Sequence, residues 1–123
     1  MKYLMLIYET PANIESRKEP DRDPYVAAWK AYHKALVAAD AYVGGEPLKD
    51  IATSTTVRLR EGKRHVQDGP FVEAREELGG FIIIEVASLD AALEWAARCP
   101  AAATGALEVR PIDVDYKANF GDS

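Results

Sequence analysis

The chain has 123 residues, 48% of them hydrophobic, and its 20 acidic and 15 basic side chains give a formal charge of -5. This length suits one globular domain with a modest core and leaves no room for a second. The negative charge disfavours non-specific binding to phosphate backbones and anionic membrane surfaces, so we expect no nucleic-acid and no membrane partner. The longest apolar runs are also far shorter than the roughly 20 residues of a membrane helix.

Cysteine and histidine are scarce, which limits the chemistry to expect. A single cysteine, Cys99, can form no disulfide within the chain, and no signal-peptide pattern precedes the first apolar run, so we expect a cytoplasmic location. The two histidines, His33 and His65, have no metal-ligand spacing. We therefore expect no metal. Gly44-Gly45 lacks both the Walker lysine and the Rossmann spacing of a nucleotide motif, and we expect no cofactor.

The first third of the chain predicts a strand, a loop and a helix. Residues 2–8, KYLMLIY, have a strand composition, and the polar segment ETPANIESRKEPDRDP with its three prolines is expected to be a surface loop over residues 9–23. Asp23 can accept hydrogen bonds from the free amides of a first helical turn, and Pro24 suits the first helical position. We therefore predict a helix from Pro24 to about Asp40.

The middle of the chain predicts short strands. Residues 41–43 end at Gly44-Gly45, and Glu46-Pro47-Leu48 is expected to be irregular or a sheet edge. STTVRLREG and RHVQD are expected to pair through a turn at Glu61-Gly62. Gly79-Gly80 would let the chain turn sharply into FIIIEVA, which is the strongest strand pattern.

The last third predicts a helix, a strand and a tail. Ser88 is placed to cap a helix from Leu89 to about Cys99, which Pro100 would stop, and ALEVRPIDV follows as a strand. The order of elements is the split βαβ pattern of a ferredoxin-like α+β domain with an antiparallel sheet. We expect one domain over residues 1–116 and a flexible tail over residues 117–123.

Both faces of the predicted sheet are apolar. In the first strand, Leu4 and Leu6 lie on one face while Met5 and Ile7 lie on the other. Two helices can cover only one face of a small antiparallel sheet, so a partner must cover the second. The simplest partner for a small domain is another copy, and we predict a homodimer through the sheet face.

Two residues are candidates for acid-base chemistry. His33 shares a helical stripe with Trp29 and Leu36 and is expected to point inward, as a general acid/base or as a core histidine with satisfied nitrogens. Asp68 heads the turn Asp68-Gly69, where its carboxylate can accept a hydrogen bond from its own backbone or take part in chemistry.

Several further side chains are candidates for ligand binding, and each also has a structural interpretation. Tyr8 and Trp29 could stack on a small ligand or simply pack in the core. Glu73 and Arg75 belong to a charged run that could line a polar pocket or form a solvated surface. Arg110 could bind an acidic ligand at a dimer seam or pair across strands.

Four segments in this order resemble the YCII-related (DGPF-domain) family: MKYLMLIY, VGGEPL, DGPFVEAREELGGFIIIEVASLDAALEWAARCPAA and GALEVRP. The resemblance covers nearly the whole chain apart from residues 9–23 and the tail. It implies a dimeric α+β barrel of ferredoxin-like protomers.

The resemblance also implies two functional hypotheses. Relatives are often encoded beside extracytoplasmic-function sigma factors, which implies a small-molecule-binding, regulatory or auxiliary module, here with a possible anionic metabolite as ligand. In the broader YCII-like group, a histidine and an aspartate are proposed to act as an acid/base pair in a cleft near the dimer interface. This implies instead a small-molecule enzyme, for which His33 and Asp68 are the candidates by residue type. Arg75 stands where the family signature usually has lysine, which disfavours a mechanism through a lysine amine at that position.

Overall fold

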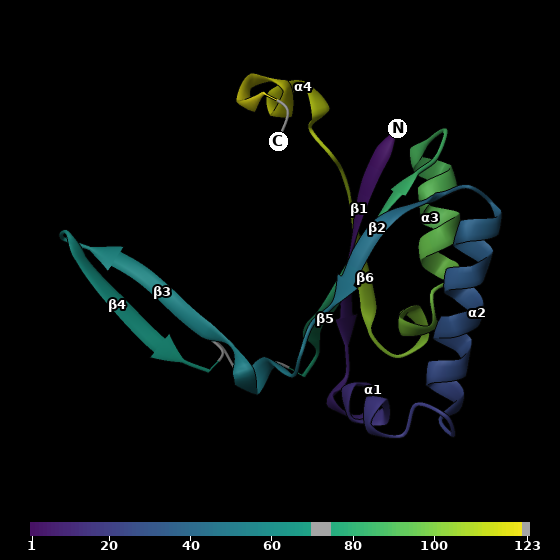
Figure 1. Cartoon of the computed structure of the whole chain (residues 1–123), viewed down its shortest axis with the longest axis horizontal. Coiled ribbons are helices and arrows are strands. Elements are labelled where there is room, and N and C mark those ends of the chain that lie inside the picture. Colours follow the sequence, from purple (N-terminus) through teal and green to yellow (C-terminus); the bar gives the residue numbers. More distant parts are fainter. Residues whose placement is uncertain (70–74, 122–123) are drawn as a thin grey trace.

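The computed structural model describes residues 1–69 and 75–121. Its main body is a four-stranded sheet with two helices packed on one face (Figure 1). The strands lie in the order β2-β5-β1-β6, and their bounds are β1 (Lys2–Glu9), β2 (Tyr42–Pro47), β5 (Glu77–Glu85) and β6 (Ala106–Pro111). The helices are α2 (Pro24–Ala38) and α3 (Leu89–Arg98). Among the described residues, no helix is both long and apolar enough to cross a bilayer.

The strand order confirms the predicted fold. Strand β5 lies between β1 and β2, which α2 connects, and β1 lies between β5 and β6, which α3 connects. Every neighbouring pair in this sheet is antiparallel. This is the split βαβ arrangement that the order of elements predicts, so the α+β class with an antiparallel sheet is confirmed.

Both long helices begin where their caps predict. The Asp23 carboxylate accepts a hydrogen bond from the Tyr25 amide at 2.8 Å, and the Ser88 hydroxyl accepts one from the Ala91 amide at 3.2 Å. Each bond satisfies an amide that has no partner within its own helix. The helices end one or two residues before the predicted positions, and Asp40 has a positive φ of 57°.

The core lies between the sheet and the two helices. Its largest fully buried side chains are Met5 of β1, Leu36 of α2 and Ile84 of β5. The expected sharp turn at Gly79-Gly80 is wrong, because both glycines lie inside β5. A Cβ on Gly80 would come 2.8 Å from the backbone oxygen of Glu46 in β2, so close packing excludes a side chain there.

The opposite face of the sheet has no helix over it in Figure 1 and is called the open face below. It carries the alternate side chains of the central strands, among them Leu4 and Leu6 of β1 and Ile83 of β5, all half-buried within the single chain. Glu108 and Arg110 of β6 lie beside Leu6 and Leu4 in the register and share this face. The apolar second face that the sequence predicts is therefore present.

Strands β3 (Thr55–Arg60) and β4 (Lys63–Asp68) form a separate two-stranded sheet. Figure 1 shows this hairpin projecting from the body on the side of the open face, away from α2 and α3. Its turn is at Glu61-Gly62, as predicted, with φ values of 51° and 77°. At its base, the buried Glu77 carboxylate accepts a hydrogen bond from the Ile51 amide at 2.9 Å.

The remaining elements are short. The end of the chain, expected as a tail, contains helical turns as far as Phe120, and the division at residue 116 stays a prediction. The short elements are α1 (Pro11–Glu15), η1 (Ser16–Lys18), η2 (Ile51–Thr53), η3 (Pro100–Ala103), α4 (Val114–Lys117) and η4 (Ala118–Phe120).

Candidate functional site

A cavity of about 580 Å³ lies beside α2, next to the β2 edge of the sheet. We call it the α2 cavity. Aromatic residues line it, among them Tyr25, Trp29 and His33, which are spaced four residues apart on one stripe of α2, and Tyr42 of β2. The Tyr25 and Trp29 rings meet edge to face at 6.4 Å between centroids, and the His33 and Tyr42 rings do so at 4.7 Å. Volumes of this size are typical of small-molecule sites.

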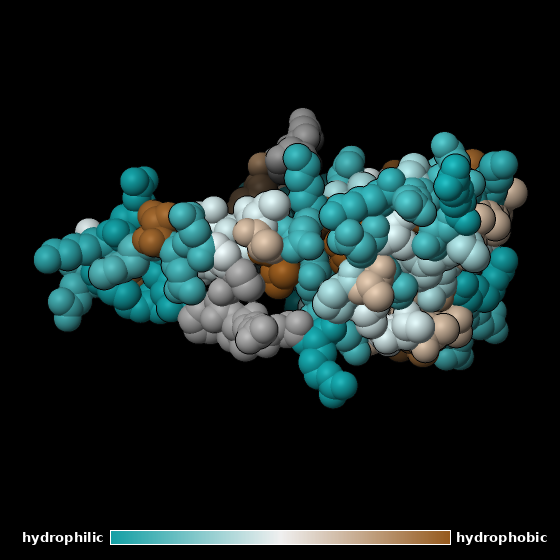
Figure 2. Space-filling view, turned by 90° about the horizontal axis from the view of Figure 1, so that it is seen from below, coloured by the Kyte–Doolittle hydropathy of each residue, from teal (hydrophilic) through white to brown (hydrophobic). Residues whose placement is uncertain are grey.

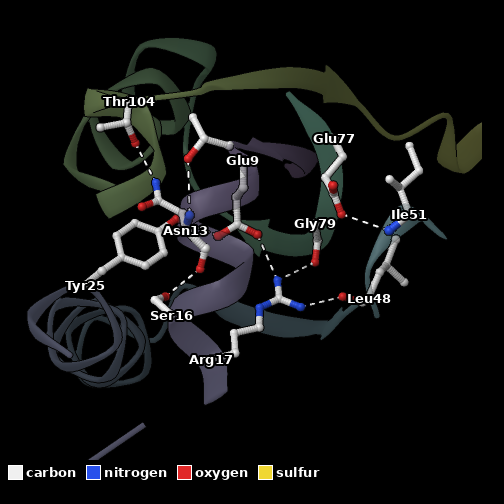
Figure 3. Close-up of polar contacts among 11 residues, drawn as sticks. Glu9, Asn13, Ser16, Arg17, Tyr25, Leu48, Ile51, Glu77, Gly79 and Thr104 are labelled. Atoms are coloured by element: carbon white, nitrogen blue, oxygen red, sulfur yellow. Dashed lines mark hydrogen bonds and ion pairs between the residues drawn. The ribbon is translucent and has the colours of Figure 1, made fainter. Parts of the chain in front are cut away.

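A buried carboxylate lies in the wall of the cavity. Glu9, the last residue of β1, is only 3% exposed. Its Oε2 accepts a hydrogen bond from Arg17 Nη2 at 2.8 Å, and its Oε1 accepts one from the Tyr25 hydroxyl at 2.5 Å (Figure 3). A buried charge is tolerated only when it is paired and hydrogen-bonded, and Glu9 is both.

Arg17 connects this carboxylate to two strands. Besides Glu9, its guanidinium donates to the carbonyl oxygen of Gly79 in β5 at 2.9 Å and to that of Leu48, just past β2 (Figure 3). A planar guanidinium with several donors suits such a junction better than a lysine amine would. The contacts hold Arg17 in place, so the polar end of the cavity is organised without a ligand.

Tyr25 contributes a hydroxyl that stays protonated. Its pKa is raised, first by burial and then by its hydrogen bond to Glu9. Both effects disfavour the phenolate, since an anion beside a carboxylate in a poorly solvated place is costly. Tyr25 therefore acts as a hydrogen-bond donor at this position.

The segment that builds this polar end was expected to be a surface loop, and that expectation is wrong. Thr10 caps α1 by accepting a hydrogen bond from the Asn13 amide at 3.2 Å, and Pro11 takes the first helical position. Asn13 then donates to the Thr104 hydroxyl at 2.7 Å, which ties α1 to the chain before β6. The Thr10-Pro11 pair has the same cap-and-proline pattern as Asp23-Pro24, and it could have predicted this helix.

Gly79 makes room for the buried carboxylate. A Cβ at this position would stand 1.9 Å from Glu9 Oε2, which is far inside van der Waals contact. Gly79 is itself buried. Its lack of a side chain is thus part of the site, and Gly79 is not there to provide a turn.

The rim of the cavity carries mixed charge with an excess of basic groups. Lys30 and Lys34 of α2 are exposed at the rim, Glu46 of β2 lies across from them, and Arg17 pairs with Glu9 inside. With Glu9 neutralised by Arg17, the two lysines outnumber the one remaining carboxylate. An anionic group on a ligand would therefore be favoured at the rim.

Two of the predicted site residues, Trp29 and His33, lie at this cavity. Trp29 is half-buried and packs against the core while it lines the cavity, so both of its interpretations apply. The expectation that His33 points into the core is wrong, because its side chain is exposed within the single chain. Its ring lies against that of Tyr42 of β2 at the cavity.

Of the other predicted residues, those that the structure describes do not line the α2 cavity. Tyr8 and Arg110 lie on the open face, on the other side of the sheet from Glu9. Asp68 is exposed at the end of β4, and Arg75 is exposed just before β5. Glu73 lies outside the described residues. Within a single chain, His33 and Asp68 do not share the α2 cavity.

A metal centre has no support in the described part of the chain, where no three His, Cys, Asp or Glu side chains are grouped to hold an ion. Cys99 is buried, and burial raises the pKa of its thiol to about 12. Such a thiol is a small core group without nucleophilic character near neutral pH.

Comparisons with known proteins agree with this fold. The chain is 34% identical over 116 residues to an uncharacterised protein of Rhizobium meliloti (strain 1021), covering 91% of this chain and 92% of that protein. Its fold is similar to that of 5-chloro-2-hydroxyhydroquinone dehydrochlorinase from Burkholderia phenoliruptrix AC1100, solved in complex with 2,5-dihydroxybenzoquinone. That structure has a TM-score of 0.53 and 20% sequence identity, with 92% of this chain and 94% of the other covered. The YCII-related domain matches residues 1–114, and the chain therefore belongs to the YCII-related family.

Proposed function

We propose that this protein binds a small anionic ring compound in the α2 cavity and acts as a binding or regulatory module. The observation that carries the proposal is the buried Glu9 carboxylate, held by Arg17 and Tyr25 in the wall of an aromatic-lined cavity. A cavity with apolar walls and a few fixed polar groups is the usual form of a small-molecule site.

The lining indicates the chemistry of the ligand. The rings of Trp29 and Tyr42 offer apolar contacts to a planar ring, while Glu9 can accept a hydrogen bond from a ligand hydroxyl. Lys30 and Lys34 favour an acidic substituent directed toward the rim. The ligand of the similarly folded dehydrochlorinase, 2,5-dihydroxybenzoquinone, is a small ring with two hydroxyl groups and fits this description. It is a suitable first probe.

An enzyme that uses a His33/Asp68 acid-base pair is the second candidate. It is supported by the position of His33 at the cavity, because an imidazole can exchange a proton near neutral pH. Asp68 would have to come from a second copy, since it lies away from the cavity of its own chain. The binding proposal requires no such contribution and is therefore preferred.

We further propose that two copies pair through their open faces in the cytoplasm. The apolar rows of Leu4, Leu6 and Ile83, which no helix covers, support the pairing. The single reduced Cys99 agrees with a cytoplasmic location. Light scattering of the purified protein tests the pairing, and a monomer at micromolar concentration would contradict it. Cell fractionation tests the location.

Calorimetric titration with 2,5-dihydroxybenzoquinone, followed by a panel of hydroxylated ring acids, tests the binding. We expect saturable binding that weakens by at least roughly tenfold in Glu9→Gln, because a ligand hydroxyl loses its charged acceptor. Lys34→Ala should weaken the binding of an anionic ligand by about two- to fivefold, whereas Lys117→Ala, in α4, should leave that binding unchanged. Equal affinity of all four proteins would contradict the site.

A turnover assay with each bound compound separates the two candidates. If the protein is only a binding module, no product forms with any compound that saturates the cavity. Product formation that is abolished by His33→Ala and by Asp68→Asn, with binding retained, would instead establish the acid-base pair.

A further inference from the structure

The projecting β3/β4 hairpin exposes apolar side chains that no other part of the chain covers within residues 1–69 and 75–121. Val57, Leu59 and Val66 are 61%, 66% and 54% exposed. Val57 pairs directly with Val66 across the two strands, and Leu59 follows Val57 on the same face. Figure 2 shows apolar side chains among hydrophilic ones on this projecting part.

The other face of the hairpin is polar. It carries Thr56, Arg58, His65 and Gln67, so the hairpin is amphipathic. A lone two-stranded hairpin is at best marginally stable in water and needs a surface on which to pack. The amphipathic pattern indicates that its apolar face packs on such a surface.

The position of the hairpin indicates which surface that is. The hairpin projects on the side of the open face, whereas α2 and α3 lie on the other side of the sheet (Figure 1). A second copy stacked on the open face would therefore lie beside the hairpin of the first. Under two-fold symmetry each hairpin would contact the body of the other copy, so the contact would occur twice.

The charges favour the same occupant. The hairpin, residues 55–68, contains four of the fifteen Lys and Arg residues and two of the twenty Asp and Glu residues, so its formal charge is +2 and that of the rest of the chain is -7. A basic hairpin and an acidic body attract each other between copies.

We propose that the β3/β4 hairpin is a dimerisation arm that packs the face bearing Val57, Leu59 and Val66 against the body of a second copy. This inference rests on the proposed pairing through the open faces and adds a second contact to it. It also explains why an amphipathic hairpin is kept outside the core of a small domain.

Sedimentation equilibrium of a matched pair of variants tests the arm. Val57→Asp places a carboxylate on the apolar face, and Thr56→Asp places the same charge one residue away on the polar face. We expect Val57→Asp to raise the dimer dissociation constant by at least about tenfold, because two carboxylates would be buried without partners, and Thr56→Asp to raise it by less than about threefold. Both positions lie outside the core, so circular dichroism should show an intact body in each variant.

The two proposals fail in different ways. A wild-type monomer would overturn both the open-face pairing and the arm. A wild-type dimer with equal dissociation constants for Val57→Asp and Thr56→Asp would overturn the arm alone. Binding of another protein or of nucleic acid by the hairpin, with dimer affinity unchanged in Val57→Asp, would also overturn it.

Cross-linking locates the contact. Leu59→Cys can be labelled with a benzophenone maleimide at neutral pH, because the buried Cys99 has a pKa of about 12 and does not compete. In mixtures of ¹⁴N- and ¹⁵N-labelled protein, we expect mixed-isotope cross-links from the hairpin to the body. Cross-links found only within one chain would contradict the arm.

Discussion

The body and the hairpin both contain strands with apolar residues at alternate positions, but these residues are buried in the body and exposed in the hairpin. In β5, the alternate residues Ile82 and Ile84 are buried beneath the helices, whereas in β3 the alternate residues Val57 and Leu59 are among the most exposed apolar side chains. Alternation of apolar residues thus predicts a strand and a buried face in both places. Whether that face is buried within the chain depends on which elements lie over it.

The body also holds the organised polar groups. Arg17 of η1 pairs with the buried Glu9 of β1 and donates to the Gly79 carbonyl of β5, and the Tyr25 hydroxyl adds α2. The hairpin presents its charges on exposed strands, where ion pairs contribute little to stability. The two regions should therefore differ in how much a truncated side chain lowers the free energy of unfolding and in how well a glycine position accepts a side chain. They should also differ in how much their groups contribute to the pH dependence of stability.

The largest expected difference is between two leucine truncations. Leu36→Ala in the core should lower the free energy of unfolding by about 2–5 kcal/mol, because it leaves a cavity among fully buried neighbours. Leu59→Ala in the hairpin should change it by less than about 0.5 kcal/mol, measured by urea denaturation at concentrations where the protein is monomeric. A loss of similar size for both would show that the hairpin is packed within its own chain.

Two glycine substitutions test how tightly the body is packed. Gly79→Ala should cost about 1–3 kcal/mol, since its Cβ would displace the Glu9 carboxylate from Arg17. Gly44→Ala, in the edge strand β2, meets nothing within 4 Å and should be neutral or slightly stabilising. Thermal unfolding of the two variants measures this, and an unaffected Gly79→Ala would mean that Glu9 can move freely.

The smallest expected effect is on the free energy of unfolding at alkaline pH, where the buried Cys99 thiol of the body titrates. Burial raises the pKa of Cys99 from 9.0 to about 12 in the folded protein, so above pH 9 the unfolded chain releases a proton that the folded chain keeps. Stability from this group is complete below pH 9 and should fall by up to ~1.4 kcal/mol per pH unit as the pH rises toward 12. Tyr25 and Tyr32, whose pKa values burial also raises, act in the same direction above pH 10.

A variant isolates the thiol in this titration. Cys99→Ala should show a shallower decline of the unfolding free energy between pH 9 and pH 10 than the wild type, whatever its stability at neutral pH. Parallel declines would mean that the thiol is not the titrating group.

Local sequence signals predicted the parts of the fold that depend on neighbouring residues. Asp23-Pro24 and Ser88 begin the two long helices, and Glu61-Gly62 makes the hairpin turn, because caps and tight turns are formed within a few residues. The same type of signal at Thr10-Pro11 begins α1, in a segment whose polar composition predicts a loop. Arg17 lies in η1, directly after this helix.

The candidate site depends on contacts between residues far apart in the chain. Arg17 and Gly79 meet through a hydrogen bond that spans 62 residues, and Arg17 lies outside the segments that resemble the family. Helical periodicity places His33 and Leu36 on one stripe, but Leu36 is buried in the core and His33 is exposed at the cavity, since periodicity gives a direction around a helix and not the neighbour on that side.

The sequence by itself determined the elements, their order and the presence of two apolar sheet faces, because propensity, capping and alternation act over short distances. Only the tertiary structure decided that Glu9 is buried beside Gly79, that His33 faces a cavity, and that the β3/β4 hairpin projects from the body. Burial and pairing are properties of the neighbours that a residue acquires in three dimensions, and those neighbours come from distant parts of the chain.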